Sequence, residues 1–337
     1  MEIAAEQARY FRKVVLEYSE CWIATHVLAD IDAVASVAAL VHILQKIHDA
    51  CAISLVFPEG VAASARALLS LLPQKLIVKE LPTSPPLLIL VDVANPRHTG
   101  WLYERVPWNA TPCIVIDHHQ MLHQPPNTVL PIVVPEAAAT SEIIWQLARH
   151  LNIHLPADIV TGLLAGILVD SKNFTSATPS TFRCVADMLE AGGSLSKARE
   201  LTISRPDISE RIARLKAARR IRLFRSNEWL IAVTRVGSHQ ASAANALISM
   251  GADLAVVYGI QKKELRISLR CTPLFRKRTG INLATDLAKQ IAELLGGSGG
   301  GHPAAAAVKA PFRKQRIESA ILSEIERLLP LEEILVE

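Results

Sequence analysis

The feature of this sequence that most constrains its fold is the alternation of short apolar segments with stretches of helical periodicity. In the first half of the chain, apolar runs predict strands over 21–26, 52–57, 87–92 and 113–119, with 128–134 as an edge strand. The periodicity predicts helices over 4–18, 33–48, 61–72, 138–151, 156–169 and 179–191. Strands and helices that alternate in this way form a parallel sheet covered on both faces.

The pattern changes in the second half of the chain. A helix ends in glycines within 190–195, and a basic helical segment that runs to about 225 connects it to the later strands. These strands are predicted over 228–236, 254–260 and 265–270, and a polar turn at 261–264 makes the last two a hairpin. Helices are predicted over 240–250, 283–295 and 314–329. We therefore expect a parallel-sheet α/β domain over 1–193, a helical linker over 194–222 and a smaller α/β domain with a mixed sheet over 223–337.

Composition agrees with a globular protein whose core is aliphatic. Half of the 337 residues are hydrophobic but only 5% are aromatic. No apolar run is as long as a membrane span, and the charged, amphipathic N-terminus lacks the apolar region of a signal peptide. The five cysteines stand apart without a Cys-x-x-Cys pair, which argues against a zinc ribbon and a disulfide scaffold. A cytoplasmic protein is expected.

Positive charge is concentrated in one segment. The net charge of +4 is too small to indicate a nucleic-acid-binding protein. Residues 199–225, however, carry nine arginines and lysines with few acids. A solvated helix face and a surface for a polyanion both remain open.

Four apolar segments of the first domain end in acids or histidines. Because the carboxyl ends of parallel strands share one edge of a sheet, the side chains that come after the strands are expected to meet there. The residues are His26, Asp30, Asp32, Asp92, Asp117, His118, His119 and Asp170.

A single aspartate at such a position is usually a helix cap. Four such ends in one domain, two of them with histidines, are hard to explain by capping alone. Clustered carboxylates repel one another and become tolerable when a divalent cation lies among them. Aspartate and histidine without cysteine favour Mn²⁺ or Mg²⁺, with Fe²⁺ or Co²⁺ as alternatives. The set suffices for two ions that share a carboxylate, the arrangement used for displacement at phosphorus.

With these residues in hand, the chain resembles the DHH phosphoesterase superfamily. The segment "VIDHH" (115–119) is similar to its naming motif, and "THVLADIDAVAS" (25–36) to its first motif. "LVD" (90–92) and "GILVDSKNF" (166–174) resemble two further motifs. "RISLR" (266–270) and "GGSGGGHPAAAA" (296–307) resemble the associated C-terminal domain. The subgroup that the chain resembles most contains oligoribonucleases that are also 3′-phosphoadenosine 5′-phosphate phosphatases.

The resemblance implies a role for each position. One ion would be held by His26, Asp30 and Asp92, and the other by Asp32, Asp92, His118 and Asp170, so that Asp92 bridges them. His119 would contact a substrate phosphate, and Asp117 would orient the histidines from behind. The other end of the substrate would be bound by Gly299, Gly300, Gly301 and His302, with help from Arg270. The two divalent cations would be Mn²⁺ in the first place, with Mg²⁺ or Co²⁺ as alternatives.

The implied activity is hydrolysis of short oligonucleotides, linear dinucleotides or 3′-phosphoadenosine 5′-phosphate by metal-activated hydroxide. Two alternatives stay open: a RecJ-like exonuclease that tracks long single strands along 199–225 and 276–278, and a non-catalytic nucleotide-binding regulator. The stretch 296–301 is also open to interpretation as a flexible linker. The expected partner is a nucleotide or short nucleic acid and not a membrane. The sequence leaves open whether the substrate is RNA or DNA and whether a dinucleotide substrate is cyclic or linear. It also leaves open whether the protein is a monomer or a homodimer.

Overall fold

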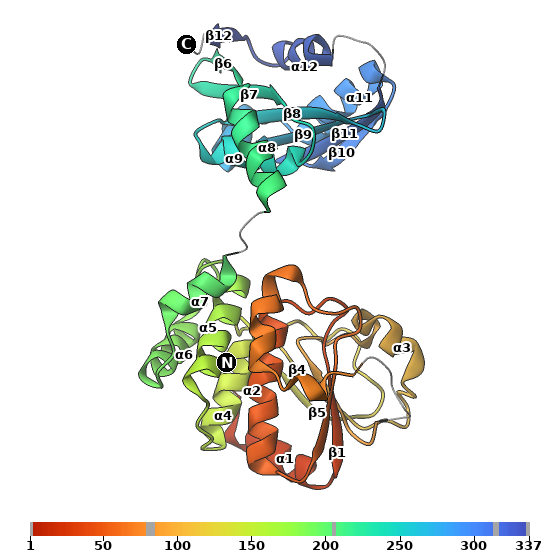
Figure 1. The fold of residues 1–337 in the computed structure, drawn as a ribbon, viewed down its shortest axis with the longest axis vertical. Helices are drawn as coiled ribbons and strands as arrows, with labels where there is room; N and C mark the ends of the chain where they lie inside the picture. The colour runs from red at the N-terminus through yellow and green to blue at the C-terminus, as the bar shows by residue number, and fades with distance from the viewer. Residues whose placement is uncertain (1–2, 79–84, 204–206, 313–316, 335–337) are drawn as a thin grey trace. The chain divides into compact units, whose positions relative to one another are not determined.

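The structure, a computed structural model, describes residues 3–78, 85–203, 207–312 and 317–334. It divides into two compact units, Met1–Ser204 and Arg205–Glu337 (Figure 1). The division falls within the predicted linker, whose described parts are helices α7 (Leu195–Thr202) and α8 (Ile208–Arg219). In the described part of the chain, no helix combines the length and apolar character needed to cross a membrane.

The first unit contains the predicted parallel sheet. Its strands are β1 (Glu20–Ala24), β2 (Ala52–Val56), β3 (Leu88–Val91), β4 (Cys113–Asp117) and β5 (Thr128–Val133). They lie in the order β2-β1-β3-β4-β5, and every neighbouring pair is parallel. The sheet confirms the predicted fold class and places β5 at an edge, as expected.

Alternate residues of each strand enter two different hydrophobic cores. On β1, Cys21 and Ile23 pack with the helices on one face, while Trp22 and Ala24 belong to the core on the other face. Figure 1 shows the helices of the first face, which are α1 (Ala5–Leu16), α2 (Ile31–Ile47), α4 (Thr140–His150), α5 (Ala157–Asp170), α6 (Pro179–Glu190) and α7. The other face is covered by the short helix α3 (Trp101–Arg105) after the 3₁₀ turn Pro96–Thr99. Because both faces are buried, the strands are almost continuously apolar.

One predicted helix of this unit has a different type from its neighbours. The helix predicted over 61–72 is a 3₁₀ helix over Ala63–Leu71. In this segment the side chains of Ala65 and Leu68 are buried in the core. Their spacing of three residues fits the period of a 3₁₀ helix.

The second unit contains a seven-stranded mixed sheet in the order β10-β11-β9-β8-β7-β6-β12. Only β7 and β8 are parallel neighbours. The strands are β6 (Arg222–Ser226), β7 (Trp229–Arg235), β8 (Leu254–Gln261), β9 (Glu264–Cys271), β10 (Ser298–His302), β11 (Ala305–Pro311) and β12 (Glu332–Ile334). The helices are α9 (Gln240–Ser249), α10 (Pro273–Thr279), a π-helix over Leu283–Ala288, α11 (Lys289–Leu295) and α12 (Ile317–Glu326). The predicted start of the last helix, 314–316, lies outside the described residues.

Two expectations for the second unit are corrected by this sheet. The basic segment is not helical up to 225, because α8 ends at Arg219 and β6 begins at Arg222. Strand β6 is held by pairing with β7 and by the burial of Phe224. The linker interpretation of 296–301 is also wrong, because β10 pairs with β11 from Ser298↔Lys309 to His302↔Ala305.

The glycines of β10 differ in what surrounds them. A Cβ atom at Gly299 would lie 2.2 Å from the carbonyl oxygen of Ala288, whereas one at Gly300 would meet no atom within 4 Å. Close packing against the π-helix therefore requires glycine at 299. Nothing in the packing requires it at 300.

We predict that Gly299→Ala lowers the free energy of unfolding by about 1–3 kcal/mol, because backbone must move to admit the methyl group. Gly300→Ala should change it by less than about 0.5 kcal/mol, because its methyl group enters open space. Urea unfolding followed by circular dichroism measures both. Equal losses of stability in the two variants would contradict the packing described for β10.

Candidate metal centre

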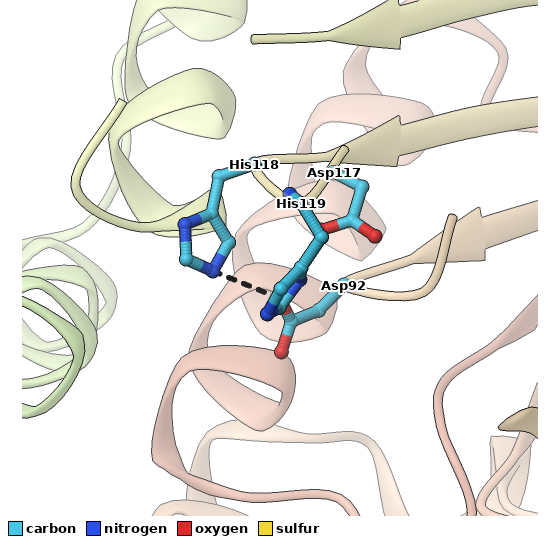
Figure 2. Close-up of side chains that lie close together, drawn as sticks. All are labelled: Asp92, Asp117, His118 and His119. Atoms are coloured by element: carbon cyan, nitrogen blue, oxygen red, sulfur yellow. Dashed lines mark hydrogen bonds and ion pairs between the residues drawn. The ribbon is translucent and has the colours of Figure 1, made fainter. Parts of the chain in front are cut away.

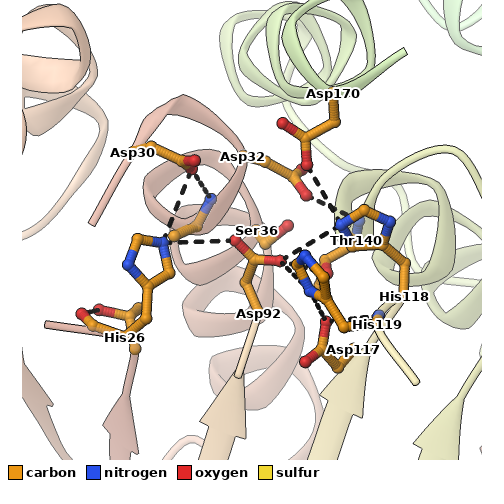
Figure 3. A network of polar contacts seen from close by, with 12 residues as sticks. His26, Asp30, Asp32, Ser36, Asp92, Asp117, His118, His119, Thr140 and Asp170 are labelled. Carbon is orange, nitrogen blue, oxygen red and sulfur yellow. Dashed lines mark hydrogen bonds and ion pairs between the residues drawn. The ribbon is translucent and has the colours of Figure 1, made fainter. Parts of the chain in front are cut away.

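The predicted ligands of the first unit converge at the carboxyl edge of the sheet, as Figure 3 shows. The strands β1, β3 and β4 are consecutive neighbours in the sheet, so the residues at their carboxyl ends lie side by side. His26 follows β1, Asp92 follows β3, and Asp117 ends β4. Helices α2 and α5 bring Asp30, Asp32 and Asp170 to the same place.

One group of possible ligands consists of His26, Asp30 and Asp92, whose ligand atoms all lie within 4.8 Å of one another. The His26 Nε2 atom is 3.9 Å from Asp30 Oδ1 and 3.6 Å from Asp92 Oδ2. These are the three residues that the resemblance assigns to the first ion.

A second group consists of Asp32, Asp92, His118 and Asp170, within the same limit of 4.8 Å. The His118 Nε2 atom lies 3.2 Å from Asp170 Oδ2 and 3.8 Å from Asp92 Oδ1. Asp92 thus belongs to both groups, with Oδ2 towards His26 and Oδ1 towards His118. This is the geometry that a bridging carboxylate needs.

Asp117 and His119 lie beside the second group (Figure 2). Asp117 Oδ1 accepts a hydrogen bond from the backbone N–H of His119 at 3.0 Å and contacts its Nδ1 atom at 2.8 Å. Asp117 was expected to orient both histidines, but in the described structure its hydrogen bonds are to His119. With Asp92 and His118, the pair also forms a third group of possible ligands.

Burial makes the negative charges of the two central aspartates costly. Asp32 and Asp92 are 0% and 4% exposed, and burial raises the pKa of both carboxyls. The nearby charges of Asp92 and Asp170 raise the pKa of Asp32 further. Such a cluster is stabilised by positive charge.

The two histidines respond to the same carboxylates. Contacts with Asp30 and Asp92 raise the pKa of His26 to about 10. Burial opposes the charged form of His118, but Asp170 and the other carboxylates outweigh it and raise its pKa to about 9. The buried Nε2 atom of His118 makes an ion-pair contact with Asp170 Oδ2 at 3.2 Å but has no hydrogen bond of good geometry with any described residue. This ring nitrogen lies among carboxylate oxygens and is available as a metal ligand. A mixed set of nitrogen and oxygen ligands fits divalent cations of the Mn²⁺ type.

Asp30 caps a helix and also belongs to a group of possible metal ligands. Its side chain accepts a hydrogen bond from Ala33 N at 3.1 Å and so caps α2. Burial would raise the pKa of Asp30, but the hydrogen bonds from His26 and Ala33 lower it. The capping interpretation of "ADIDA" is therefore correct for this residue without removing it from the first group.

The helix α4 was predicted, but sequence reasoning missed that its first residues hold both central aspartates by hydrogen bonds. Asp32 accepts hydrogen bonds from the backbone N–H groups of Thr140 at 2.7 Å and Ser141 at 2.9 Å. The Thr140 hydroxyl donates to Asp92 Oδ1 at 2.8 Å. A Cβ atom at Gly166 of α5 would lie 2.6 Å from Asp32 Oδ1, so glycine leaves room for this arrangement. The only available signal was a Thr-Ser pair at a predicted helix start.

Asp92 itself adopts a left-handed backbone conformation, with φ of 59°. This conformation costs about 1–3 kcal/mol for residues other than glycine, although aspartate tolerates it better than most. The conformation is supported by the hydrogen bond from Asp92 N to Ile116 O at 2.9 Å and by the bond from Thr140.

All of these possible ligands except the fully buried Asp32 line a pocket of about 930 Å³. Two cationic residues, Arg97 and Lys172, also line it. Both are exposed, and neither makes an ion pair with an acid in the described part of the chain. Among the described residues, both cations are therefore free to interact with an anionic ligand.

The candidate substrate residues of the second unit lie on β9 and β10. Register places His302 and Arg270 on either side of Ala305, so the two side chains share one sheet face. Arg270 Nη1 donates to Leu269 O at 2.8 Å and finds no acid among the described residues, while burial lowers its pKa. Gly300 lies open on the strand, whereas Cβ atoms at Gly299 and Gly301 would meet backbone oxygens of Ala288 and Ala305.

Comparison with protein families finds two matching domain models, one in each part of the chain. Residues 20–167 match the N-terminal domain of the DHH family, and residues 233–329 match the DHHA1 domain.

Comparison with individual proteins finds relatives over most of the chain. An uncharacterized protein of Methanocaldococcus jannaschii, MJ0988, is 30% identical over 319 residues, which are 93% of this chain and 95% of that one. The bifunctional oligoribonuclease and PAP phosphatase NrnA of Thermus thermophilus is 31% identical over 218 residues, which are 61% of this chain and 63% of that one. An exopolyphosphatase-related protein from Bacteroides fragilis has a similar fold, with a TM-score of 0.60, 16% identity, and coverage of 96% and 97%.

We predict that Mn²⁺ raises the thermal unfolding midpoint of the protein, because ligands that bind only the folded state stabilise it. An ion at about 100 times its dissociation constant adds about 2.7 kcal/mol. Asp92→Asn should remove most of this response, since Asp92 belongs to every group, and should leave the metal-free midpoint equal or higher. Asp49→Asn, at an exposed loop residue, is the control. A full Mn²⁺ response in Asp92→Asn would refute the shared ligand.

Proposed function

We propose, since this chain belongs to the DHH family of metal-dependent phosphoesterases, that it hydrolyses short oligonucleotides and small nucleotide phosphoesters. Linear dinucleotides and 3′-phosphoadenosine 5′-phosphate are the substrates we favour. The name of the NrnA relative supports this choice, although the match spans 63% of that protein.

The observation that carries the proposal is the sharing of Asp92 between two ligand groups. His26 and Asp30 complete one group, and Asp32, His118 and Asp170 complete the other. Bound divalent ions, with Mn²⁺ as our first choice, would activate a water molecule and neutralise the charge of the phosphoryl group.

The remaining side chains of the pocket have complementary roles. The hydrogen bond with Asp117 raises the pKa of His119, which favours the protonated ring. Because its Nδ1 atom is held by Asp117, Nε2 is left to donate to a phosphoryl oxygen of the substrate. Asp117 acts as a positioning residue for His119. Thr140 keeps Asp92 oriented.

In the second unit, we assign phosphate or nucleotide binding to Arg270, Gly300 and His302. Arg270 offers a guanidinium without an acidic partner among the described residues, in the same row as His302. The open space at Gly300 lets a ligand approach the backbone of β10. Gly299 and Gly301 were also candidates. We assign them a packing role instead, because Cβ atoms added there would clash with neighbouring backbone.

Three arginines of the basic segment are paired with acids, which lowers their contribution to a track for long single strands. Arg214 pairs with Glu210, Arg222 with Glu318 and Glu333, and Arg225 with Glu332. In the second basic stretch, Arg278 pairs with Glu228. Cations that are already neutralised release fewer counterions from a nucleic-acid backbone.

An assay of purified protein in Mn²⁺ tests the proposal. The panel contains a linear dinucleotide, a 24-mer, a cyclic dinucleotide, 3′-phosphoadenosine 5′-phosphate and pyrophosphate. We expect turnover of the dinucleotide and 3′-phosphoadenosine 5′-phosphate, no turnover after chelation, and a much lower rate on the 24-mer. Preference for the 24-mer, or hydrolysis of pyrophosphate alone, would rule out the proposed substrates.

We predict that His302→Ala raises KM for the dinucleotide about tenfold while kcat changes less, because His302 would bind substrate away from the reacting phosphate. Gly300→Ala should act in the same direction with unchanged stability. His123→Ala, at an exposed loop residue of the first unit, is the matched control. A fall in kcat with unchanged KM in His302→Ala would contradict the assignment.

A further inference from the structure

The turn after Asp170 contains an unusual backbone. Lys172, Asn173 and Phe174 are three consecutive residues with positive φ, at 52°, 53° and 66°. None of them is glycine, for which this conformation carries no steric cost. Asparagine tolerates the left-handed region better than lysine or phenylalanine does. The turn is therefore strained directly beside a candidate metal ligand.

Specific contacts impose this conformation. Lys172 N donates to Val169 O at 3.0 Å, and Asn173 N donates to Leu168 O at 2.8 Å. Phe174 N donates to the buried Ser171 hydroxyl at 2.9 Å, and the Phe174 ring packs at a tilt against the Phe182 ring, with centroids 5.4 Å apart. These contacts explain the path of the backbone. They do not explain why a lysine stands at 172.

Strain alone does not indicate function in this chain. Lys262 and Lys263 also have positive φ, at 45° and 65°, but they form the turn of the β8–β9 hairpin, which requires such values. What distinguishes Lys172 is its place. It lines the 930 Å³ pocket together with His26, Asp92, His118 and Asp170, whereas Asn173 does not.

The charge of Lys172 fits an anionic ligand of that pocket. The side chain is exposed and forms no ion pair with a described acid, although Asp170 is two residues away. A mobile ammonium group at the rim of a metal pocket is suited to a phosphate oxygen, which it binds as a point charge. Arg97 supplies a second cation at the same pocket.

We infer that Lys172 is a substrate-contacting residue that binds the phosphate group held in this pocket, and that the strained turn is retained to present it. The inference rests on the proposed function, because it names a further contact for the same substrate. The inference predicts that Lys172→Gly weakens substrate binding while stability stays unchanged or rises.

Three variants separate charge from strain. Lys172→Gly removes both the charge and the strain, and Lys172→Met removes the charge but keeps the strained backbone. Asn173→Gly relieves the neighbouring position, which is exposed but outside the pocket, and keeps the charge. For each Mn²⁺-loaded full-length variant we would measure the thermal midpoint, the affinity for inorganic phosphate by calorimetry, and KM and kcat on a linear dinucleotide.

We expect Lys172→Gly and Lys172→Met each to weaken phosphate binding and raise KM about tenfold, with a smaller effect on kcat. The thermal midpoint should be unchanged or higher in Lys172→Gly and Asn173→Gly, and unchanged in Lys172→Met. Asn173→Gly should keep wild-type phosphate affinity and KM.

Wild-type phosphate affinity in Lys172→Met, or an equal loss in Asn173→Gly, would overturn the inference, as would a Mn²⁺-loaded wild type that binds no phosphate. If the wild type hydrolyses no phosphoester but its phosphate affinity depends on Lys172, the proposed substrates are wrong and the contact stands.

Discussion

The structure of the first unit depends on how several buried carboxylates are accommodated within a few ångströms of one another. Asp32 and Asp92 are almost fully buried, and Asp170 and two histidines lie beside them. In a purely structural core this arrangement would be unfavourable, because burial and mutual repulsion both oppose the charged forms. Divalent cations would remove the repulsion, and we propose that Asp92, which belongs to all three groups of possible ligands, is shared by two of them.

The residues around these aspartates hold them in place through specific hydrogen bonds and close packing. Backbone N–H groups at the start of α4 bind both oxygens of Asp32, and the Thr140 hydroxyl binds Asp92. Gly166 lets α5 approach them closely. Backbone strain is concentrated at the same place, at Asp92 and in the turn after Asp170. Contacts that orient metal ligands from behind commonly change metal affinity by about 10- to 100-fold.

Much of this centre was predictable from the sequence because parallel strands share a carboxyl edge. That rule alone brings His26, Asp92 and His118 together. The position of Asp92 between the other two depends on the strand order β1-β3-β4, which no local pattern reveals. The hydrogen bonds from Thr140 and Ser141 to Asp32 join residues that are 108 and 109 positions apart in the chain. Strand β10 escaped prediction because Ser-Gly-Gly-Gly-His has no apolar alternation, and only packing against Ala288 and pairing with β11 define it.

The central claim is that two cations share the carboxylate of Asp92. Anomalous diffraction from Mn²⁺-soaked crystals tests it most directly. The account predicts two peaks on either side of Asp92, about 3.5–4 Å apart, one next to His26 and Asp30 and the other next to Asp32, His118 and Asp170. A single peak that does not touch Asp92, or no peak at this edge of the sheet at saturating Mn²⁺, would contradict it.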